Sequence, residues 1–484
     1  MSIAIDRSLK DTLRRNPKAF YPSSVKAPSE PLRLFPFLLK FIRNPLLVIP
    51  EAAYREKIVR YGRWFGRVAW VNDPALIKDV LLDRSELFPI TPLQKRVLGP
   101  LGGRGVLSSD GAEWRWQRQM AAPLFRHAEL LRYVPAMSSA AEAMLATWSG
   151  DASGGYRSID KDMTRLTFRV ISETVLPGGD EHIGAAIERA SGDYFGSISW
   201  TFVYRFFQLP SWMPHPGRRR MLRAEKFLRR SVAALIAVRK ASPASRNDLF
   251  KRLSAARHPE TGEPMSAELL RDSVLTFMMV GHETTAKALT WMLYLLSQSE
   301  DWTAKLRGEI EAVAGTEQIG PQHIHRLELT QQVVKEALRL YPPVPSITRH
   351  AAADLELGGQ QIVAGTLINI PIFALHRHRS LWRDPECFDP NRFAPEAEAK
   401  IARTQFMPFG AGPRACVGAS FALIEATAVL ATLIRSANFC LKATHLPTPV
   451  SRVSLAPKGG MPMRVEVRTT HDIGRSGLDS MRSI

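Results

Sequence analysis

The stretch FGAGPRACVG, residues 409–418, decides how this chain is to be interpreted. Its first part, from Gly410 to Ala415, has the G-x-G-x-x-G/A spacing of a loop that binds the phosphates of a dinucleotide. Its second part places Cys416 directly behind those glycines. The loop therefore either binds phosphates through its backbone or presents a sulfur atom, and the surrounding sequence distinguishes these two chemistries.

The sequence around this loop does not suit a dinucleotide. A dinucleotide loop follows a buried strand in a βαβ unit, and an acidic residue about 20 positions later binds the ribose hydroxyls. Here the preceding residues are KIARTQFMPF (400–409), with Pro408 two positions before Gly410. Where the acid is expected, the chain reads TLIRSAN (432–438). The spacing matches and the context does not, so phosphate binding is not expected.

Cys416 is better suited to bind a metal. The residues that follow it, CVGASFALIEATAVLATLI (416–434), form an apolar helical pattern, so the sulfur is expected near a helix N-terminus. The helix dipole and the free N–H groups stabilise a thiolate there, and Arg414 adds positive charge. Gly410 and Gly412 let the backbone turn tightly and approach a flat cofactor. A buried cysteine is also often an inert core residue, so the loop alone leaves both interpretations open.

The composition is that of a folded globular protein: 484 residues, of which 45% are hydrophobic and 23% charged. The three cysteines, Cys387, Cys416 and Cys440, are too few and odd in number for a disulfide framework. The N-terminal residues contain no uninterrupted apolar segment of the signal-peptide kind. We therefore expect a reducing compartment and a cytoplasmic protein.

Two segments bear on possible partners. The formal net charge is +19, and the densest basic stretch is 218–240, which is typical of a solvated helix face. No zinc-finger or RNA-binding motif accompanies it, so binding to nucleic acid is not expected. Segment 32–50 is strongly apolar but is interrupted by Lys40, Arg43 and two prolines, which excludes a spanning helix. We expect it to pack against the body of the fold, with peripheral contact to a membrane surface as the alternative.

Most of the chain is predicted to be helical and to form one domain over residues 1–484, with loosely ordered ends at 1–30 and 469–484. Small sheets are expected within 345–372 and 450–468. The run from 266 to 299 predicts a long helix that is apolar nearly all round. Its middle nevertheless reads GHETT (281–285), and polar groups in a buried helix are costly unless they are satisfied.

Five short motifs occur along the chain in the following order: W-x-x-x-R at Trp114 and Arg118, VGHETT (280–285), EALR (336–339), FDPNRF (388–393) and FGAGPRACVG (409–418). Together they resemble the signature motifs of the cytochrome P450 superfamily, in particular its soluble bacterial members. The cysteine loop matches the pattern F-G-x-G-x-R-x-C-x-G at every fixed position. Agreement of five ordered motifs by chance is not expected.

The resemblance implies a mainly α fold with small β-sheets, a triangular prism with a long central helix over the cofactor. The cofactor would be haem b, iron protoporphyrin IX, with the Cys416 thiolate as the iron ligand. The residues that the resemblance assigns to haem binding are Cys416, Arg414, Trp114, Arg118, Arg349, Phe409, Gly410 and Gly418. The arginines and the tryptophan among them would bind the haem propionates.

The resemblance also assigns residues to catalysis, to support of the fold and to the substrate pocket. Gly281 would open the helix for oxygen, and Glu283 with Thr284 would deliver protons to it. Glu336, Arg339 and Arg392 would form a buried structural network under the cysteine loop. The candidate pocket residues are Val280, Met278, Ser346, Ile347 and Val453. Val280 stands where alanine is frequent, which would narrow the pocket.

The implied activity is that of a monooxygenase, which inserts one atom of O₂ into a lipophilic substrate such as a fatty acid or terpenoid. Fewer than 70 residues follow Cys416, so a fused reductase is not expected. Electrons would come from a separate ferredoxin or flavodoxin with its own reductase, docked on basic residues near the cysteine. A monomer is expected. The alternatives are a peroxide-driven or rearranging haem-thiolate enzyme, and a haem-binding sensor without turnover.

Overall fold

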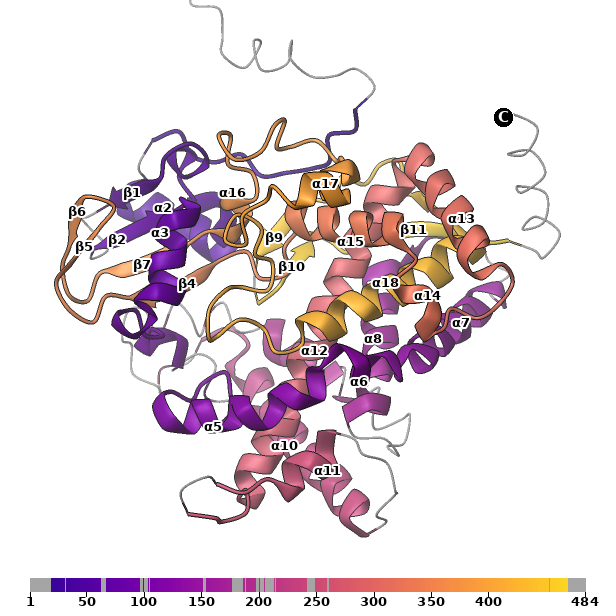
Figure 1. The fold of residues 1–484 in the computed structure, drawn as a ribbon, viewed down its shortest axis with the longest axis horizontal. Helices are drawn as coiled ribbons and strands as arrows, with labels where there is room; N and C mark the ends of the chain where they lie inside the picture. The colour runs from indigo at the N-terminus through magenta and orange to yellow at the C-terminus, as the bar shows by residue number, and fades with distance from the viewer. Residues whose placement is uncertain are drawn as a thin grey trace, which may run out of the picture.

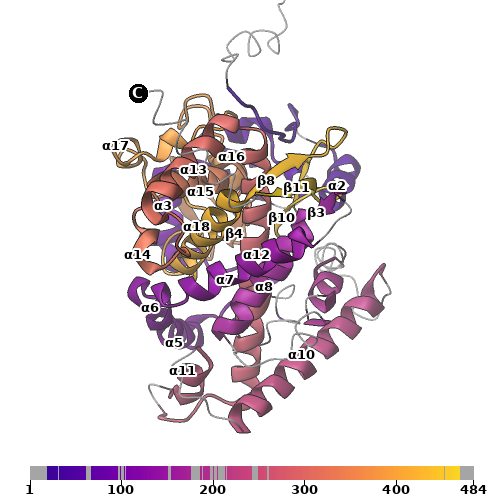
Figure 2. The same cartoon turned by 90° about the vertical axis from the view of Figure 1, so that its right-hand side faces the viewer.

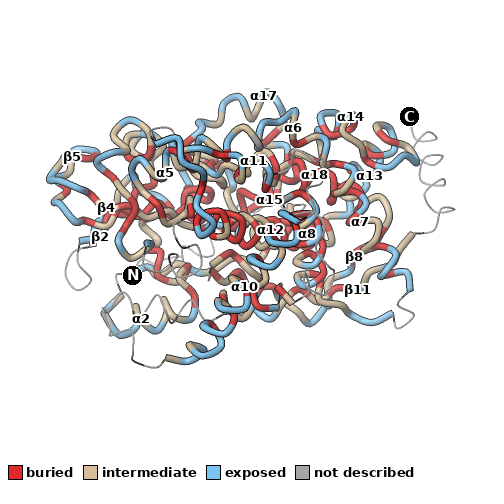
Figure 3. Tube along the Cα trace, turned by 90° about the horizontal axis from the view of Figure 1, so that it is seen from below, coloured by how far each residue is buried: buried red, intermediate tan, exposed pale blue. Residues whose placement is uncertain are grey.

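A long helix, α12 (Ala267–Ser297, 31 residues), runs through the middle of the molecule (Figures 1 and 2). Its N-cap is Ser266, whose hydroxyl accepts a hydrogen bond from the backbone N–H of Leu269 at 3.1 Å. Most of its side chains are apolar and buried, as the sequence predicts for a central helix (Figure 3). Among the described helices, those that pack most extensively against it are α8 (Ile159–Val175), α10 (Arg218–Ala241), α15 (Glu328–Leu340) and α18 (Ala419–Ser436).

The computed structural model describes residues 19–30, 32–61, 67–95, 99, 103, 105–150, 154–175, 186–187, 189–196, 200, 204, 213, 215–241, 249–258, 261–451 and 453–468. The remaining α-helices in these ranges are α2 (Leu34–Arg43), α3 (Pro74–Lys78), α5 (Gly111–Ala121), α6 (His127–Leu131), α7 (Val134–Ser149), α11 (Leu249–Ala255), α13 (Glu300–Ala314), α14 (Pro321–Ile324), α16 (Ile372–Leu375) and α17 (Pro395–Glu398). Short helices of other hydrogen-bonding types are η1 (Pro45–Val48), η2 (Glu51–Tyr54), η3 (Asp79–Asp83), η4 (Ser85–Leu87), η5 (Ala122–Phe125) and η6 (Pro390–Phe393).

The strands form small sheets, of which the four-stranded one lies to the left in Figure 1. Its order is β1 (Ile58–Tyr61), β2 (Val68–Val71), β7 (Leu367–Ile370), β4 (Ile347–His350), with β2 and β7 parallel and the other pairs antiparallel. The strands of the other sheets are β3 (Arg157–Ser158) with β11 (Pro462–Val467) and β8 (Ala437–Leu441), β9 (Pro449–Ser451) with β10 (Leu455–Pro457), and β5 (Leu355–Leu357) with β6 (Gln360–Ile362). The small sheets expected within 345–372 and 450–468 are present, whereas β1 and β2 carried no clear sequence signal.

Two hydrophobic clusters hold these layers together and place the cysteine loop between them. The larger cluster surrounds α12 and includes Leu289, Trp291 and Leu430 of α18. The smaller one lies on the four-stranded sheet and includes Met407 and Ala411 of the cysteine loop. The loop is therefore packed on the sheet on one side and leads into a helix that packs on α12 on the other.

Segment 32–50 behaves as two parts, and the expectation that it packs against the body holds for only one of them. Leu46, Val48 and Ile49 are buried, as that expectation requires. The preceding helix α2 differs, since none of its described side chains is buried and Phe35 is 76% exposed. The boundary between the two parts is Asn44, the residue that follows α2. The side chain of Asn44 donates to the carbonyl of Pro449 at 3.0 Å and fixes the chain at that point.

The sequence also led to expectations about order at the chain termini and about membrane-spanning helices. Residues 19–30 fall in the segment expected to be loosely ordered, yet the ring of Phe20 contacts those of Tyr294 and Phe388. Residues 1–18 and 469–484 lie outside the described part of the chain. Among the described helices, α18 is the one long and apolar enough to span a bilayer, and 67% of its apolar window is buried inside the protein, as in a core helix.

Candidate functional site

The cysteine loop is a tight turn closed by its own backbone. The N–H of Cys416 donates to the carbonyl of Phe409 at 2.9 Å, and the N–H of Gly410 donates to that of Met407 at 3.0 Å. Gly410 and Gly412 have φ values of 72° and 75°, which other residues rarely adopt. A Cβ atom at Gly412 would lie 1.9 Å from the carbonyl oxygen of Leu81 in η3. The structure thus gives Gly412 a reason that the sequence argument missed: the glycine admits the backbone of η3.

Cys416 lies two residues before Gly418, the N-cap of α18, as the sequence predicts. Burial raises the pKa of its thiol, while the N–H of Gly418 and the charge of Arg118 oppose that rise. The side chain itself is exposed. The sulfur is therefore recessed among protein atoms, yet its own surface remains open to a ligand, and the two groups that stabilise a thiolate are in position. This is the donor set that a haem iron requires.

Three arginines near the cysteine loop test whether the site fits haem. Burial lowers the pKa of Arg118 and of Arg414, and it lowers the pKa of Arg349 to about 10, aided by the nearby charge of Arg414. Arg349 is 9% exposed and donates to the carbonyl of Thr348 at 2.8 Å. In the described ranges no acid forms an ion pair with Arg118 or Arg349. Arg349, which is buried, and Arg118, which is half-buried, are thus cations without a carboxylate partner and fit an anionic ligand. Haem carries two propionates, so these residues fit the group.

Arg414 and Trp114 join the W-x-x-x-R helix to the cysteine loop. The guanidinium of Arg414 lies over the ring of Trp114, 4.3 Å from its centroid. Arg414 also donates to the carboxylate of Asp110 at 2.5 Å. Asp110 is the N-cap of α5 and accepts from the N–H of Gly111. The first turn of α5, which carries Trp114, is therefore tied directly to the residue two positions before Cys416.

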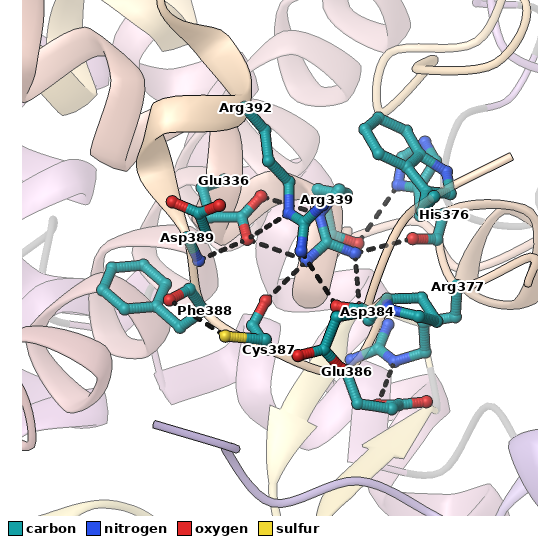
Figure 4. A network of polar contacts seen from close by, with 12 residues as sticks. Glu336, Arg339, His376, Arg377, Asp384, Glu386, Cys387, Phe388, Asp389 and Arg392 are labelled. Atoms are coloured by element: carbon teal, nitrogen blue, oxygen red, sulfur yellow. Dashed lines mark hydrogen bonds and ion pairs between the residues drawn. The ribbon is translucent and has the colours of Figure 1, made fainter. Parts of the chain in front are cut away.

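The predicted structural network is present, and its Glu336–Arg339 pair is fully buried (Figure 4). Glu336 and Arg339 of α15 form a bidentate pair at 2.6 and 2.7 Å, and both side chains are 0% exposed. The remaining Arg339 donors reach the carbonyls of His376, Pro385 and Cys387 at 2.7–3.0 Å. All five guanidinium N–H groups are thereby used.

Arg392 joins the same carboxylate less closely than the motif alone would indicate. Its Nε atom lies 3.6 Å from Oε1 of Glu336, and its Nη2 atom donates to the carbonyl of Asp384 at 2.8 Å. The same Oε1 accepts from the backbone N–H of Asp389 at 2.9 Å. The FDPNRF segment is therefore held on α15 by Glu336 through both backbone and side chain.

His376 connects this network to the cysteine loop, a link that the motifs do not reveal. Its Nε2 atom accepts from the backbone N–H of Met407 at 3.0 Å, so its Nδ1–H donates to the carbonyl of Arg339. Burial and the charge of Arg339 lower the pKa of His376 to about 3, which keeps the ring neutral. Met407 in turn accepts from the N–H of Gly410. Arg339, His376, Met407 and Gly410 thus form a continuous chain of hydrogen bonds that ends in the loop of Cys416.

The middle of α12 carries hydroxyl groups that bond to its own backbone. Thr284 donates to the carbonyl of Val280 at 2.9 Å, and Thr285 donates to that of Gly281 at 3.2 Å. A Cβ atom at Gly281 would lie 3.0 Å from Cδ1 of Ile171, so the glycine lets α8 pack closely. Val280 is 38% exposed although its neighbours in the helix are mostly buried. The helix therefore presents Val280 to open space.

Glu283 faces a polar cavity of about 470 Å³. Its Oε1 atom accepts from the hydroxyl of Ser454 at 3.0 Å and lies 3.5 Å from Nζ of Lys287. The lining includes Glu283, Lys287, Ser454, Lys161, Arg165 and Val453. Val453, a predicted pocket residue, thus lies beside the acid. A carboxylate at the edge of a polar cavity can exchange protons with water there.

The other predicted pocket residues have distinct surroundings. Met278 is buried, and its carbonyl contacts Nδ1 of His282 at 2.7 Å. Ser346 donates to the side chain of Asn369. Ile347 lies in β4, with its Cδ1 atom 3.3 Å from where a Cβ of Gly410 would be. The structure brings Ile347 against the cysteine loop and gives Met278 and Ser346 partners within the protein.

Sequence reasoning also passed over Glu425 of α18, which lies beneath the threonines of α12. Burial raises the pKa of its carboxyl to about 8, although a hydrogen bond with Thr285 lowers it. Within the described residues its Oε1 atom has no hydrogen-bond partner. The sequence signal was a single acid in an otherwise apolar helix.

Comparison with known proteins agrees with this geometry. Residues 31–462 match the sequence profile of the cytochrome P450 family. The chain is 31% identical over 414 residues to cytochrome P450 72A11 of Arabidopsis thaliana, covering 83% of this chain and 80% of that protein. It is 30% identical over 437 residues to 11-oxo-beta-amyrin 30-oxidase of Glycyrrhiza uralensis, covering 84% and 81%.

A bacterial relative and a solved structure extend the comparison. Cyclooctat-9-en-7-ol 5-monooxygenase of Streptomyces melanosporofaciens is 32% identical over 400 residues, covering 81% of this chain and 84% of that protein. The crystal structure of a cytochrome P450DA heme domain matches with a TM-score of 0.78 at 23% identity, over 94% of this chain and 100% of that one. The predicted mainly α fold with its central helix is thereby confirmed. From the profile match and the identity to these relatives, the chain belongs to the cytochrome P450 family.

Proposed function

We propose that the substrate of this cytochrome P450 monooxygenase is a terpenoid, in preference to a fatty acid. Two relatives support this class by their names, the amyrin oxidase and the cyclooctat-9-en-7-ol monooxygenase. One observation in the chain supports a monooxygenase activity: the same protein carries an exposed Cys416 that can bind the haem iron and, on α12, the adjacent acid and hydroxyl of Glu283 and Thr284. Haem bound through Cys416 supplies the chemistry that binds and splits O₂.

The chain's own residues supply protons and position the cofactor. Glu283 takes protons from the polar cavity, since Lys287 and Ser454 hold its carboxylate at the cavity edge. Thr284, the next residue, offers its hydroxyl oxygen as a proton acceptor because its own proton is donated to Val280. Arg118 and Arg349 bind the propionates by charge.

One pair of measurements tests this activity and its proton delivery. Purified protein is assayed with NAD(P)H and surrogate redox partners, and separately with peroxide alone. We expect turnover in the first assay, and Glu283→Gln lowers it at least tenfold while the spectrum of the reduced, carbon monoxide-bound protein keeps the red-shifted band of thiolate-ligated haem. Cys416→Ala loses that band. Turnover with peroxide alone, unaffected by Glu283→Gln, would establish the peroxide-driven alternative.

The substrate class is tested separately. Terpenoids and fatty acids are titrated into the oxidised protein, and the shift in haem spin state is followed. We expect tighter apparent binding by polycyclic terpenoids than by fatty acids. A screen in which fatty acids alone produce the shift would contradict the terpenoid assignment.

We further propose that electrons come from a separate acidic ferredoxin or flavodoxin that docks near the cysteine loop. Exposed Arg115 and Arg126 support this docking site, because the neighbouring Phe125 lies against Gly418. The net charge of +19 favours an acidic partner. We expect Arg115→Glu with Arg126→Glu to slow reduction by the partner about tenfold or more, without changing reduction by dithionite. Equal slowing by both reductants would refute the site.

A cytoplasmic location is proposed on the state of the cysteines. Cys387, Cys416 and Cys440 are all free, which suits a reducing compartment. Fractionation of cells that express the full chain tests this, and recovery outside the cytoplasmic and inner-membrane fractions would contradict it.

A further inference from the structure

His282 of α12 is a buried histidine whose ring is held in one orientation. The residue is 1% exposed, and its Nδ1 atom lies 2.7 Å from the backbone carbonyl oxygen of Met278, one turn earlier in the helix. Helix α8 lies beside α12 here (Figure 2), and the ring of Phe168 in α8 packs edge to face on the imidazole, with the ring centroids 5.3 Å apart. The ring therefore cannot turn over without losing its hydrogen bond to Met278.

This hydrogen bond determines which ring nitrogen carries the hydrogen. A carbonyl oxygen only accepts, so Nδ1 is the donor and Nε2 carries a lone pair. Burial lowers the pKa of His282, and the positive charge of Lys287 adds to that effect while the charge of Glu283 opposes it. The ring is therefore neutral at pH 7, and what it offers to its surroundings is an acceptor rather than a positive charge.

The Nε2 atom of His282 has no hydrogen-bond partner within the described residues. Native structures pair nearly all buried acceptors with protein or with water, because an unpaired one costs free energy. His282 lines the cavity of about 470 Å³ that Glu283 also faces, together with the polar residues Thr164, Lys287 and Ser454. A polar cavity many times larger than one water molecule holds water. A water molecule of this cavity is therefore the partner that suits Nε2.

Glu283 keeps one carboxylate oxygen available to the same water. Its Oε1 atom accepts from the hydroxyl of Ser454 and lies 3.5 Å from Nζ of Lys287, whereas Oε2 accepts no hydrogen bond from the described part of the chain. A water molecule has two hydrogens, so one that donates to Nε2 of His282 keeps the second for a carboxylate.

We propose that His282 is a positioning residue for proton delivery: its Nε2 atom holds a water molecule whose second hydrogen is directed at Glu283. The proposal rests on the proposed function and adds the group that orients the proton source. When Glu283 passes its proton on, the held water gives it a proton and takes one from the other water of the cavity, so no group is consumed. The imidazole does not conduct the proton itself, because its Nδ1–H is committed to the carbonyl of Met278, which cannot pass a proton on.

Two substitutions separate this role from a purely structural one. The amide nitrogen of asparagine takes the place of Nδ1, so His282→Asn keeps the bond to Met278 and removes the acceptor. The amide oxygen of glutamine reaches the place of Nε2, so His282→Gln keeps the acceptor and gives up the bond to Met278. A role in fixing the helix is lost in the glutamine variant, whereas a role in holding water is lost in the asparagine variant.

The first readout does not depend on turnover. Crystal structures of the haem-loaded protein are compared at a resolution that shows ordered water. We expect a water within about 3.2 Å of Nε2 in wild type and of the amide oxygen in His282→Gln, and none at that place in His282→Asn. In ¹⁵N NMR spectra of the reduced, carbon monoxide-bound protein, the histidine signals that His282→Asn removes should show Nδ1 protonated and Nε2 bare.

The second readout is O₂-dependent consumption of NAD(P)H with surrogate redox partners, in H₂O and in D₂O, without added substrate. One hydrogen bond to an oriented water contributes about fivefold, so His282→Asn is expected to slow consumption about fivefold and to raise the solvent isotope effect, with His282→Gln within about twofold of wild type. Thr290→Val is the matched control, because Thr290 is a buried polar residue of the same helix that bonds to the carbonyl of Ala286 and does not line the cavity. The variants are compared once each shows the red-shifted band of thiolate-ligated haem.

The outcomes distinguish this proposal from the proposed function. If wild type consumes no NAD(P)H, the proposed function fails, and the crystal and NMR readouts still decide whether Nε2 holds water. A wild-type structure without water at Nε2, or an Nε2 that is protonated, would overturn the proposal. So would a His282→Asn variant as fast as wild type, or slowing by His282→Gln that equals or exceeds it. If His282→Gln does not fold, the comparison of wild type with His282→Asn decides.

Discussion

Replacing Arg339 with lysine tests the buried network under the cysteine loop most directly. The substitution keeps the positive charge beside Glu336 but replaces a planar group of five donors by an ammonium with three. In the structure all five donors of Arg339 are used, two on Glu336 and three on the carbonyls of His376, Pro385 and Cys387. At least two of these acceptors must therefore lose their partner.

The magnitude follows from the burial of the site. Both side chains of the pair are 0% exposed, so water cannot replace the lost donors. A hydrogen bond from a charged group contributes about 1.5–3 kcal/mol, so the loss of two gives about 3–6 kcal/mol. Folded domains are stable by about 5–15 kcal/mol, so Arg339→Lys is expected to leave the protein barely folded. Because His376 and Met407 continue the network, the cysteine loop loosens with it.

Urea unfolding of the purified protein measures this loss, with haem retention during gel filtration as a second readout. Arg169→Lys is the matched control, since Arg169 pairs with Glu173 at 3.1 Å on the surface and both side chains are about half exposed. We expect the control to cost less than about 0.5 kcal/mol. If Arg339→Lys is also within about 1 kcal/mol of wild type, the carbonyl bonds do not carry the stability assigned to them.

Three further changes test single features of the site. Gly412→Ala is expected to reduce the yield of folded protein and to destabilise it by more than about 2 kcal/mol, because φ is 75° and the new Cβ meets Leu81; circular dichroism melting checks this. The pKa of His376 is lowered to about 3, so on acidification the unfolded chain binds a proton at a higher pH than the folded protein does. Stability therefore falls as pH drops below about 6.5, by up to about 1.4 kcal/mol per pH unit. His376→Gln is expected to flatten this slope, as measured by urea titrations. The pKa of Glu425 is raised to about 8, so the wild-type protein loses stability as pH rises from about 4.5 to 8. Glu425→Gln is expected to remove that loss. The melting temperature of the variant should then exceed that of wild type by a margin that grows from pH 6 to pH 9.

The helical body could be predicted from the sequence because the patterns that indicate a helix are formed by neighbouring residues. The apolar run of α12 and its cap at Ser266, and the apolar run of α18 after the glycines, are read from neighbouring residues. Strands β1 and β2 were not predicted, because each has only four residues and the pair joins the sheet through β2, which pairs with the distant strand β7. Helix α2 was misjudged for a related reason: its composition fits a core, and only the fold decides whether anything covers it.

The candidate site also has features that are encoded locally in the sequence and features that depend on distant parts of the chain. Ligand identity at Cys416 followed from the motif, but the link from Arg339 through His376 to Met407 joins three separate stretches of chain and has no local pattern. The roles of the glycines differ too, since Gly412 and Gly281 each admit a particular neighbour, Leu81 or Ile171, which no sequence spacing names.

The burial of the arginines near Cys416 bears on how the enzyme works, because buried and exposed arginines act on different partners. Near Cys416, Arg118 and Arg349 are partly or fully buried, where burial lowers their pKa values and favours an anionic ligand, whereas Arg414 already pairs with Asp110. Arg115 and Arg126 stay exposed, where solvent screens them and they attract an acidic partner at a distance. One excess of positive charge therefore serves two purposes that depend on burial: a fixed internal site for a carboxylate-bearing cofactor, and a salt-sensitive outer face. High salt is expected to weaken the second and spare the first, so reduction by the acidic electron donor and haem retention must separate in a salt titration. If salt removes both together, the internal arginines are not shielded as the structure implies.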